Sequence, residues 1–167
     1  MRLLTFWLLL ASFAFIPNAL HAITFVGDYE GNIWTDYRNW QPHQVPGAGD
    51  LADIPQGKAV YVNGQISVGS LILGGGLNSD GNPNSSLTIN SSFSWTSGTV
   101  GVPVTLLQGC AGLWQGSLGI GANITSYGQV SCDANITMSY SSIVNYGEFD
   151  VTGTHNFGVY YSPASFE

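Results

Sequence analysis

The stretch that decides the fold is Ser86–Thr99, with the sequence SLTINSSFSWTSGT. Apolar and small polar residues alternate here in short runs, as in β-strands whose successive side chains point to opposite faces. Gly, Ser and Asn separate these runs, and they favour turns over helix interiors. Similar text recurs between Val60 and Val159, so the sequence predicts a stack of short β-coils.

Three residue pairs recur at one offset of 19 positions and indicate an internal repeat. The pairs are Leu87 with Leu106, Trp95 with Trp114, and Tyr127 with Tyr146. A coil of about 20 residues holds three short strands with turns, and stacked coils would lie about 4.8 Å apart. Like side chains would then meet in columns inside the stack. An antiparallel β-sandwich also uses many short strands and remains the alternative fold.

The composition agrees with an all-β fold and disfavours several classes of partner. Of the 167 residues, 44% are hydrophobic and 13% aromatic, while only 8% are charged. The formal net charge is −7, and Arg38 and Lys58 are the only basic residues after Arg2, histidines aside. Nucleic acids and anionic membranes are bound through clustered basic residues, so neither is an expected partner.

Residues 1–22 have the layout of a secretory signal peptide. Arg2 precedes an apolar run from Leu3 to Ile16, Pro17 follows the run, and Ala22 stands at the predicted cleavage site. The run is shorter than the roughly 20 residues that span a bilayer, and no later segment is long enough. We therefore expect a secreted or cell-surface protein with no integral membrane segment after removal of the signal.

Residues 23–59 form a different kind of segment, in which Pro and Gly are frequent enough to prevent long helices. We interpret it as an irregular cap on the N-terminal end of the stack, followed by solenoid coils over residues 60–167. Trp34 and Trp40 would cover the open core at that end. Their alternative role is to stack on sugars as aromatic platforms.

Trp95 and Trp114 lie within the predicted coils and allow the same two interpretations. Alternation puts Trp95 on the same strand face as Phe93, which favours a buried aromatic column over an exposed one. The alternative is that both indole rings line a groove and stack on a glycan. The sequence favours burial and leaves glycan stacking open.

The segment Trp34–Thr99 resembles the opening of secreted parallel β-helix modules in large surface proteins and autotransporter-like adhesins. The resemblance is carried by Trp34, Asn39-Trp40, Val45-Pro46, Gly49–Pro55, Gly57, Val60–Val62 and Val68–Leu73, and then by Leu87–Ile89, Phe93–Trp95 and Gly98-Thr99. This family implies a right-handed parallel β-helix, or β-solenoid. It also implies a structural or adhesive role, and it supplies no catalytic residues.

Cys110 and Cys132 are the only cysteines, and an even number in an exported chain predicts a disulfide. Their separation of 22 positions is close to one coil, and neighbouring coils lie within the Cα distance of a disulfide, about 4.4–6.8 Å. Two buried thiols are the alternative. His43 and His155 have no ligand spacing with the cysteines or with each other, so no metal site is expected.

Glu148 and Asp150 are the best candidates for acid–base chemistry, with Asp133 about one coil earlier. Residues two apart on a strand are about 6.6 Å apart, which is near the separation of about 5–5.5 Å in a retaining glycosidase. However, no Lys or Arg follows Lys58 to neutralise the uronate of a lyase substrate. We expect no catalytic residues and no cofactor; a glycoside hydrolase is the alternative.

The sequence therefore favours a secreted or cell-surface β-solenoid with a structural or adhesive role and no catalytic activity. A carbohydrate-binding or polysaccharide-degrading β-helix protein is the alternative function. The expected partners are surface glycans, or further copies of the chain that associate through the solenoid ends, where backbone edges are open.

Overall fold

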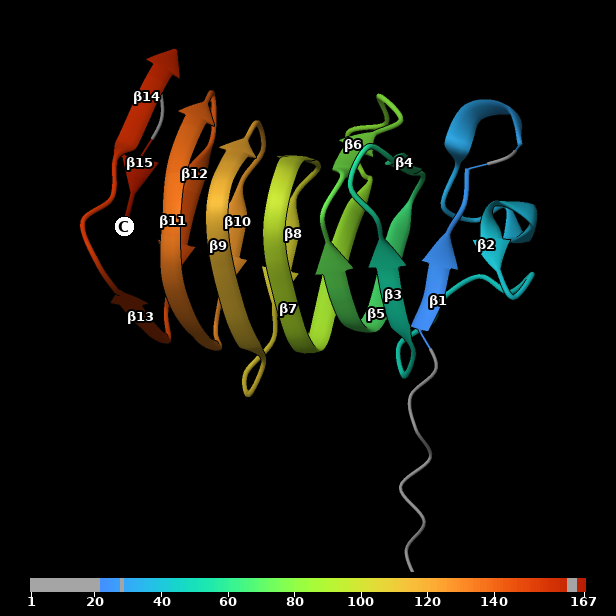
Figure 1. Ribbon diagram of the computed structural model, residues 1–167, viewed down its shortest axis with the longest axis horizontal. Coiled ribbons are helices and arrows are strands. Elements are labelled where there is room, and N and C mark those ends of the chain that lie inside the picture. The colour runs from blue at the N-terminus through green and yellow to red at the C-terminus, as the bar shows by residue number, and fades with distance from the viewer. Residues whose placement is uncertain (1–21, 28, 162–164) are drawn as a thin grey trace, which may run out of the picture.

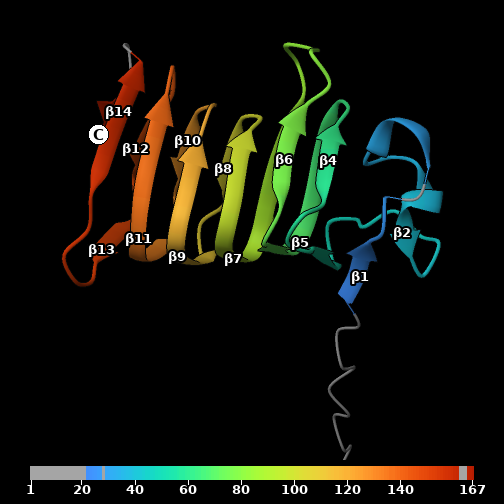
Figure 2. The same ribbon diagram turned by 45° about the horizontal axis from the view of Figure 1, so that its top comes forward.

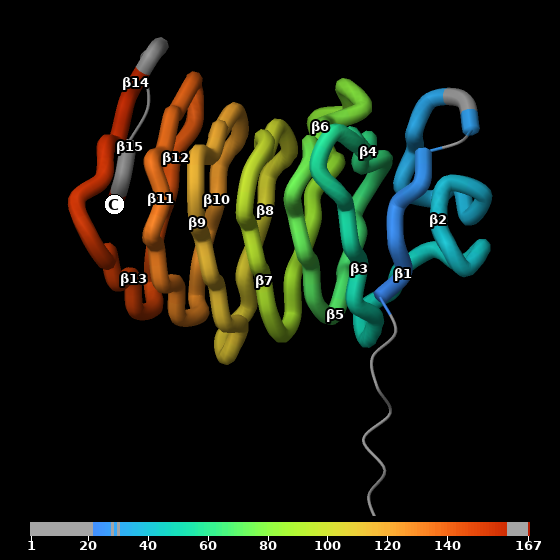
Figure 3. The backbone as a smooth tube through the Cα atoms, in the orientation of Figure 1, coloured from blue at the N-terminus to red at the C-terminus, as the bar shows by residue number. Residues whose placement is uncertain are grey.

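The computed structural model describes residues 22–27, 29–161 and 165–167 of the chain. These residues form a stack of about six coils, seen from the side in Figures 1 and 3. Among the described strands, every neighbouring pair is parallel except β1 with β2. The predicted parallel β-solenoid is thus confirmed, and the antiparallel sandwich is excluded. The predicted signal peptide lies outside the described residues except for Ala22.

Three parallel ladders run along the stack, and we name them faces A, B and C. Face A contains β1 (Ala22–Phe25), β3 (Leu51–Ile54), the last part of β5 (Gln65–Leu73), the middle of β7 (Ser86–Gly101), the first parts of β9 (Ala111–Ile120) and β11 (Gln129–Ser139), and β13 (Glu148–Val151). Face B contains β4 (Ala59–Val62), β6 (Gly76–Ser79), the last parts of β7, β9 and β11, and β14 (Phe157–Tyr161). Face C contains the first parts of β5 and β7, then β8 (Val104–Leu106), β10 (Ile124–Ser126), β12 (Ser142–Asn145) and β15 (Ser165–Phe166).

The strands alternate between inward and outward side chains, as a period of two requires. In β9, Trp114 is buried whereas the preceding Leu113 is exposed. Trp114 lies in register with Trp95 of the coil before, and their ring centroids are 5.5 Å apart. The predicted aromatic column is therefore confirmed, and it forms the centre of the core.

The repeat of 19 residues holds for two of the three predicted pairs. Trp95 and Trp114 face each other, and Tyr127 stacks on Tyr146 with ring centroids 5.0 Å apart. The third pair is wrong, because Leu106 lies beside Ile89 rather than Leu87. The corner between faces C and A spans two residues after Ile89 but four after Leu106. Unequal turn lengths therefore make the offset differ from face to face.

The N-terminal end of the stack is closed by an irregular segment, seen beside β1 in Figure 2. It contains η1 (Glu30–Asn32), η2 (Tyr37–Asn39) and β2 (Trp40–Gln41), which pairs with β1 on its outer side. Trp40 packs edge-on against Phe25 and Trp34 at 5.1 and 4.8 Å, and its Nε1 donates a hydrogen bond to the Trp34 carbonyl. Face A already begins at β1, whose first residue is Ala22, and β3 continues it within the segment predicted as irregular.

Candidate functional site

The four tryptophans that were candidates for sugar stacking are Trp34, Trp40, Trp95 and Trp114. All four are fully buried. A sugar needs an exposed ring face, and each of these rings is instead packed against other aromatic side chains. The burial favoured by the sequence is therefore found for these residues, and the alternative of glycan stacking has no exposed ring among them. Their burial follows from position, because two plug the cap and two face inward on face A.

The predicted disulfide between Cys110 and Cys132 is also wrong, because both cysteines are free and buried. Cys132 lies beside Trp114, since Gln129 pairs with Ala111 and the coil here is 18 residues long rather than 22. Cys110 precedes that strand, in the corner between faces C and A. The two residues thus differ by four positions along the strand direction, or about 13 Å, which is too far for a disulfide.

We expect neither cysteine to react with a thiol reagent in the folded protein. Burial raises the pKa of the Cys110 thiol to about 11 and also raises the pKa of Cys132. The reactive thiolate is therefore scarce at both positions, and the reagent cannot reach them. Absorbance measurements with an aromatic disulfide reagent would check this, with both thiols appearing after unfolding in denaturant. Rapid labelling of the native chain, or no thiol after unfolding, would contradict it.

The carboxylates proposed for acid–base chemistry lie on the outer surface of the last two coils. Glu148 and Asp150 are exposed on β13, and Glu148 accepts a hydrogen bond of 3.0 Å from the Gln129 side chain. The Asp133 Oδ1 atom lies 2.7 Å from Nε2 of His155, and His155 is part of the loop after β13. Glu148 and Asp150 therefore lie on the outer surface of the last coil, and Asp133 lies on the coil before it.

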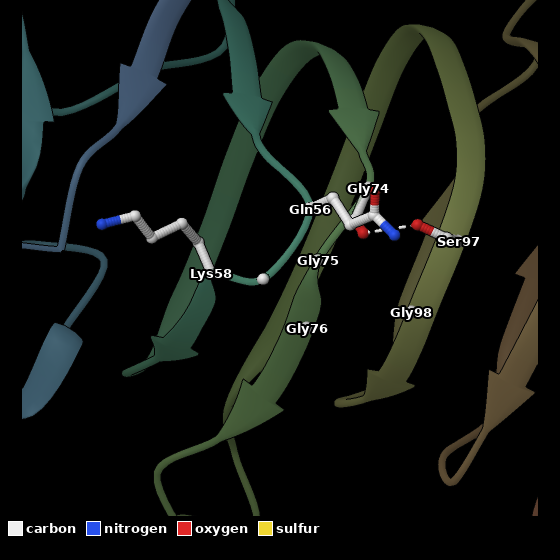
Figure 4. A pocket seen from close by; sticks show the side chains of 8 residues that line it. Gln56, Lys58, Gly74, Gly75, Gly76, Ser97 and Gly98 are labelled. Carbon is white, nitrogen blue, oxygen red and sulfur yellow. Dashed lines mark hydrogen bonds between the residues drawn. The ribbon is translucent and has the colours of Figure 1, made fainter.

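A shallow groove of about 430 Å³ crosses the corner between faces A and B (Figure 4). It is lined by Gln56, Gly57, Lys58, Gly74, Gly75, Gly76, Ser97 and Gly98. The Lys58 ammonium points away from the glycines and donates to the Val26 carbonyl, while the Ser97 hydroxyl donates to the Gly74 carbonyl at 2.6 Å. The groove therefore presents small uncharged groups and no paired acid, base or nucleophile.

The loop between β6 and β7 is a network of turns. The Asp80 carboxylate accepts hydrogen bonds from the Ser85 hydroxyl at 2.7 Å and the Asn82 backbone N–H at 3.0 Å. The Ser85 hydroxyl bond is the main reason that the pKa of Asp80 lies below its usual value. Within the described residues, no three His, Cys, Asp or Glu side chains are grouped as metal ligands would be.

The C-terminal end of the stack leaves inward-facing apolar side chains uncovered. Val151, Phe157 and Val159 are 44%, 42% and 58% exposed. They continue columns that are buried one coil earlier, where their neighbours are Cys132, Ile136 and Met138. We call the last coil, β13 to β15, the open end; it lies opposite the cap in Figures 1 and 2.

Exposed aromatic rings of the described residues are mostly tyrosines, among them Tyr127 and Tyr146 at 47% and 68%. Their rings are nearly parallel, at 13°, and stack along the solenoid axis at the corner between faces C and A. The recurrence at 19 positions identified this pair in the sequence, although it did not show that the two rings are exposed. The outer ring, Tyr146, lies near the open end.

Comparisons with known proteins add no family to this description. No family model matches the chain, and no curated protein or solved structure is significantly similar to it. In the described part of the chain, no helix has the length and apolar character needed to cross a membrane. The fold is therefore established by the structure, and the resemblance to surface adhesins stays a prediction.

Proposed function

We propose that this protein is a secreted or cell-surface β-solenoid module with a structural or adhesive role, and that it associates through its open end. The single observation that carries the proposal is the difference between the two ends of the stack. One end is closed by aromatic residues of its own chain, whereas the other presents the interior of the solenoid to solvent.

The open end has both features that drive strand association. β13 pairs with β11 on one side, and no other described strand lies on its other side. The edge of a sheet can pair with a further strand. Beside them, Val151 and Val159 offer apolar surface that would be removed from water by a covering coil. Backbone pairing and apolar burial would therefore act at the same place.

The two alternatives have less support at the level of residues. Carbohydrate binding was the alternative based on four tryptophans, and their burial removes that basis. A glycoside hydrolase was the alternative considered for Glu148 and Asp150, which lie exposed on β13 in the last coil. The low charge and the regular stack agree better with a scaffold than with a catalytic cleft. The signal-like residues 1–22 support export, and they lie almost entirely outside the described residues.

Replacing Val159 with glutamate should weaken association of the chain by at least about tenfold, because a carboxylate would enter the apolar interface without a partner. The measurement is sedimentation velocity over a range of protein concentrations, in buffer containing enough salt to screen surface charge. The matched control is Leu107→Glu, since Leu107 is also exposed, at 41%, but lies on a corner at the side of the stack.

Two results would overturn the proposed association. One is a wild-type chain that stays monomeric at every concentration and salt condition. The other is equal weakening by Leu107→Glu and Val159→Glu, which would place the contact elsewhere. Circular dichroism spectra of both variants would establish that each still forms the solenoid.

A further inference from the structure

We infer that the outer surface of the N-terminal cap (residues 29–44) binds a neutral glycan, with Tyr37 as the ring on which a sugar stacks and Arg38 and Asp36 as its hydrogen-bond partners. The inference rests on the adhesive role in the proposed function, because it names the class of ligand to which the protein adheres. It uses side chains of the cap that belong neither to the core nor to the open end.

The cap carries aromatic rings on its outside as well as in its interior. Tyr29 and Tyr37 are 41% and 52% exposed, whereas Trp34 and Trp40 are fully buried. An exposed tyrosine offers a large amphipathic contact surface and loses little conformational entropy on binding. Carbohydrate binding, which the buried tryptophans cannot provide, therefore has a different basis at this end of the stack.

Arg38 is held in a fixed orientation beside these tyrosines. Oδ1 of Asp36 accepts hydrogen bonds from N and Nε of Arg38 at 3.0 and 2.9 Å, and Oδ2 accepts one from Nη2 at 2.7 Å. The guanidinium carbon lies 4.7 Å from the centre of the Tyr29 ring, within cation–π range. The pKa of Arg38 is raised chiefly by its hydrogen bond to Asp36 and by the Asp36 charge, with smaller contributions from Tyr37 and Tyr29. The four side chains thus form one cluster.

The Tyr37 ring and the backbone of the cap are also held in place. The rings of Tyr37 and His43 meet edge to face, with centroids 6.2 Å apart and planes at 75°. The buried Asn39 side chain accepts a hydrogen bond from the Tyr29 N–H at 3.0 Å and donates one to the Ile33 carbonyl at 3.2 Å. The cluster is therefore preorganised, which lowers the cost of ordering it when a ligand binds.

This combination of groups matches the chemistry of a neutral sugar ring. A sugar has an apolar C–H face that can pack on an exposed aromatic ring, and a rim of hydroxyl groups that donate and accept hydrogen bonds. Nη1 of Arg38 lies outside the hydrogen bonds to Asp36 and can donate to such a hydroxyl in a charge-assisted bond. Because Asp36 offsets the Arg38 charge, the pair gives an anionic ligand little net attraction.

Other hollows and exposed rings of the described residues lack this combination. The groove of Figure 4 and a hollow of about 330 Å³ around Gly119 on face B have no aromatic side chain in their linings. Tyr127 and Tyr146 are exposed, but their rings stack on each other and cover part of each other's faces. The cap is therefore the place where ring surface and charged hydrogen-bonding groups occur together.

A glycan array that carries neutral, sialylated and sulfated oligosaccharides tests the inference with the purified full chain. We expect binding to neutral oligosaccharides, and no gain when sialic acid or sulfate is added to the same oligosaccharide. Calorimetric titration with the neutral oligosaccharide that gives the strongest array signal then measures the dissociation constant for wild type and variants.

Substitutions in the cluster should weaken binding in a defined order. Tyr37→Ala should raise the dissociation constant by at least about tenfold, whereas Tyr37→Phe keeps the ring and should stay within about twofold of wild type. Arg38→Lys keeps the charge but loses the planar fork, so it should raise the dissociation constant by about fivefold or more.

Tyr146→Ala is the matched control for Tyr37→Ala. It removes a tyrosine that is also exposed, at 68%, but lies near the open end, and it should leave the dissociation constant unchanged. Circular dichroism spectra would establish that every variant still forms the solenoid.

The possible results separate the inference from the function on which it rests. The inference is overturned if no oligosaccharide binds, if only sialylated or sulfated ones bind, or if Tyr146→Ala weakens binding as much as Tyr37→Ala. Equal weakening by Tyr37→Phe and Tyr37→Ala would overturn stacking on the ring. Association of the open end is measured separately by sedimentation velocity, so a chain that binds neutral glycans but stays monomeric would overturn the proposed association alone.

Discussion

Replacing Gly98 with alanine is expected to lower the free energy of unfolding by about 4 kcal/mol. Gly98 lies at the corner between faces A and B and has φ +88°, a backbone conformation that costs a residue with a side chain about 1–2 kcal/mol. An added Cβ would also lie 1.8 Å from the carbonyl oxygen of Gly75 in the preceding coil. That oxygen belongs to the backbone and cannot move aside without opening the stack.

Gly57→Ala is the matched control for this prediction. Gly57 lies at the same corner two coils earlier and has φ +80°, but nothing lies within 4 Å of the added Cβ. The Gly57→Ala substitution should therefore lower the free energy of unfolding only by the cost of the backbone conformation, about 1–2 kcal/mol. Urea unfolding followed by circular dichroism would measure both variants. Equal losses at the two positions would mean that close contact between coils contributes nothing to the stability.

Trp114→Ala is expected to lower the free energy of unfolding by about 3–5 kcal/mol, the usual loss for a buried aromatic residue. Trp114 is fully buried and packs against Phe93, Trp95 and Phe149, with ring centroids 6.2, 5.5 and 5.5 Å away. These contacts join coils on both sides of β9. The cavity would therefore loosen several coils at once, because a stack is stable only through its neighbours.

Leu113→Ala tests whether this loss comes from the interior. Leu113 precedes Trp114 on the same strand and is 44% exposed on the outer side. Its truncation should cost less than about 1 kcal/mol, in the range of ordinary surface substitutions. Denaturant unfolding at a fixed temperature compares the two variants. A loss at Leu113 as large as that at Trp114 would show that face A is buried on both sides, as it would be in an assembly.

Loop lengths explain most of the differences between the sequence predictions and the structure. The offset of 19 residues identified Trp95 with Trp114 and Tyr127 with Tyr146, which the structure confirms. The same reasoning fails for Leu87 and for the two cysteines, because corners of different length shift the register of individual faces. Repeats within strands are local features, whereas register depends on every turn between the strands.

The candidate site could not be found from sequence in the same way. Val151 and Val159 follow the same alternation as the buried residues of earlier coils, and nothing local distinguishes them. In the structure both are exposed, and among the described residues no further coil covers them. The acidic residues of β13 were visible in the sequence as the alternative candidates for catalysis, and in the structure they lie exposed on that strand.

By itself, the sequence determined that the chain is all-β, that it forms stacked coils and that aromatic residues form a column in the core. These properties depend on period-two alternation and on turn residues, which act over a few neighbouring positions. Only the tertiary structure decided which residues stack, that Cys110 and Cys132 are free, and which end is open. Those properties depend on contacts between coils, and such contacts exist only once the whole stack has formed.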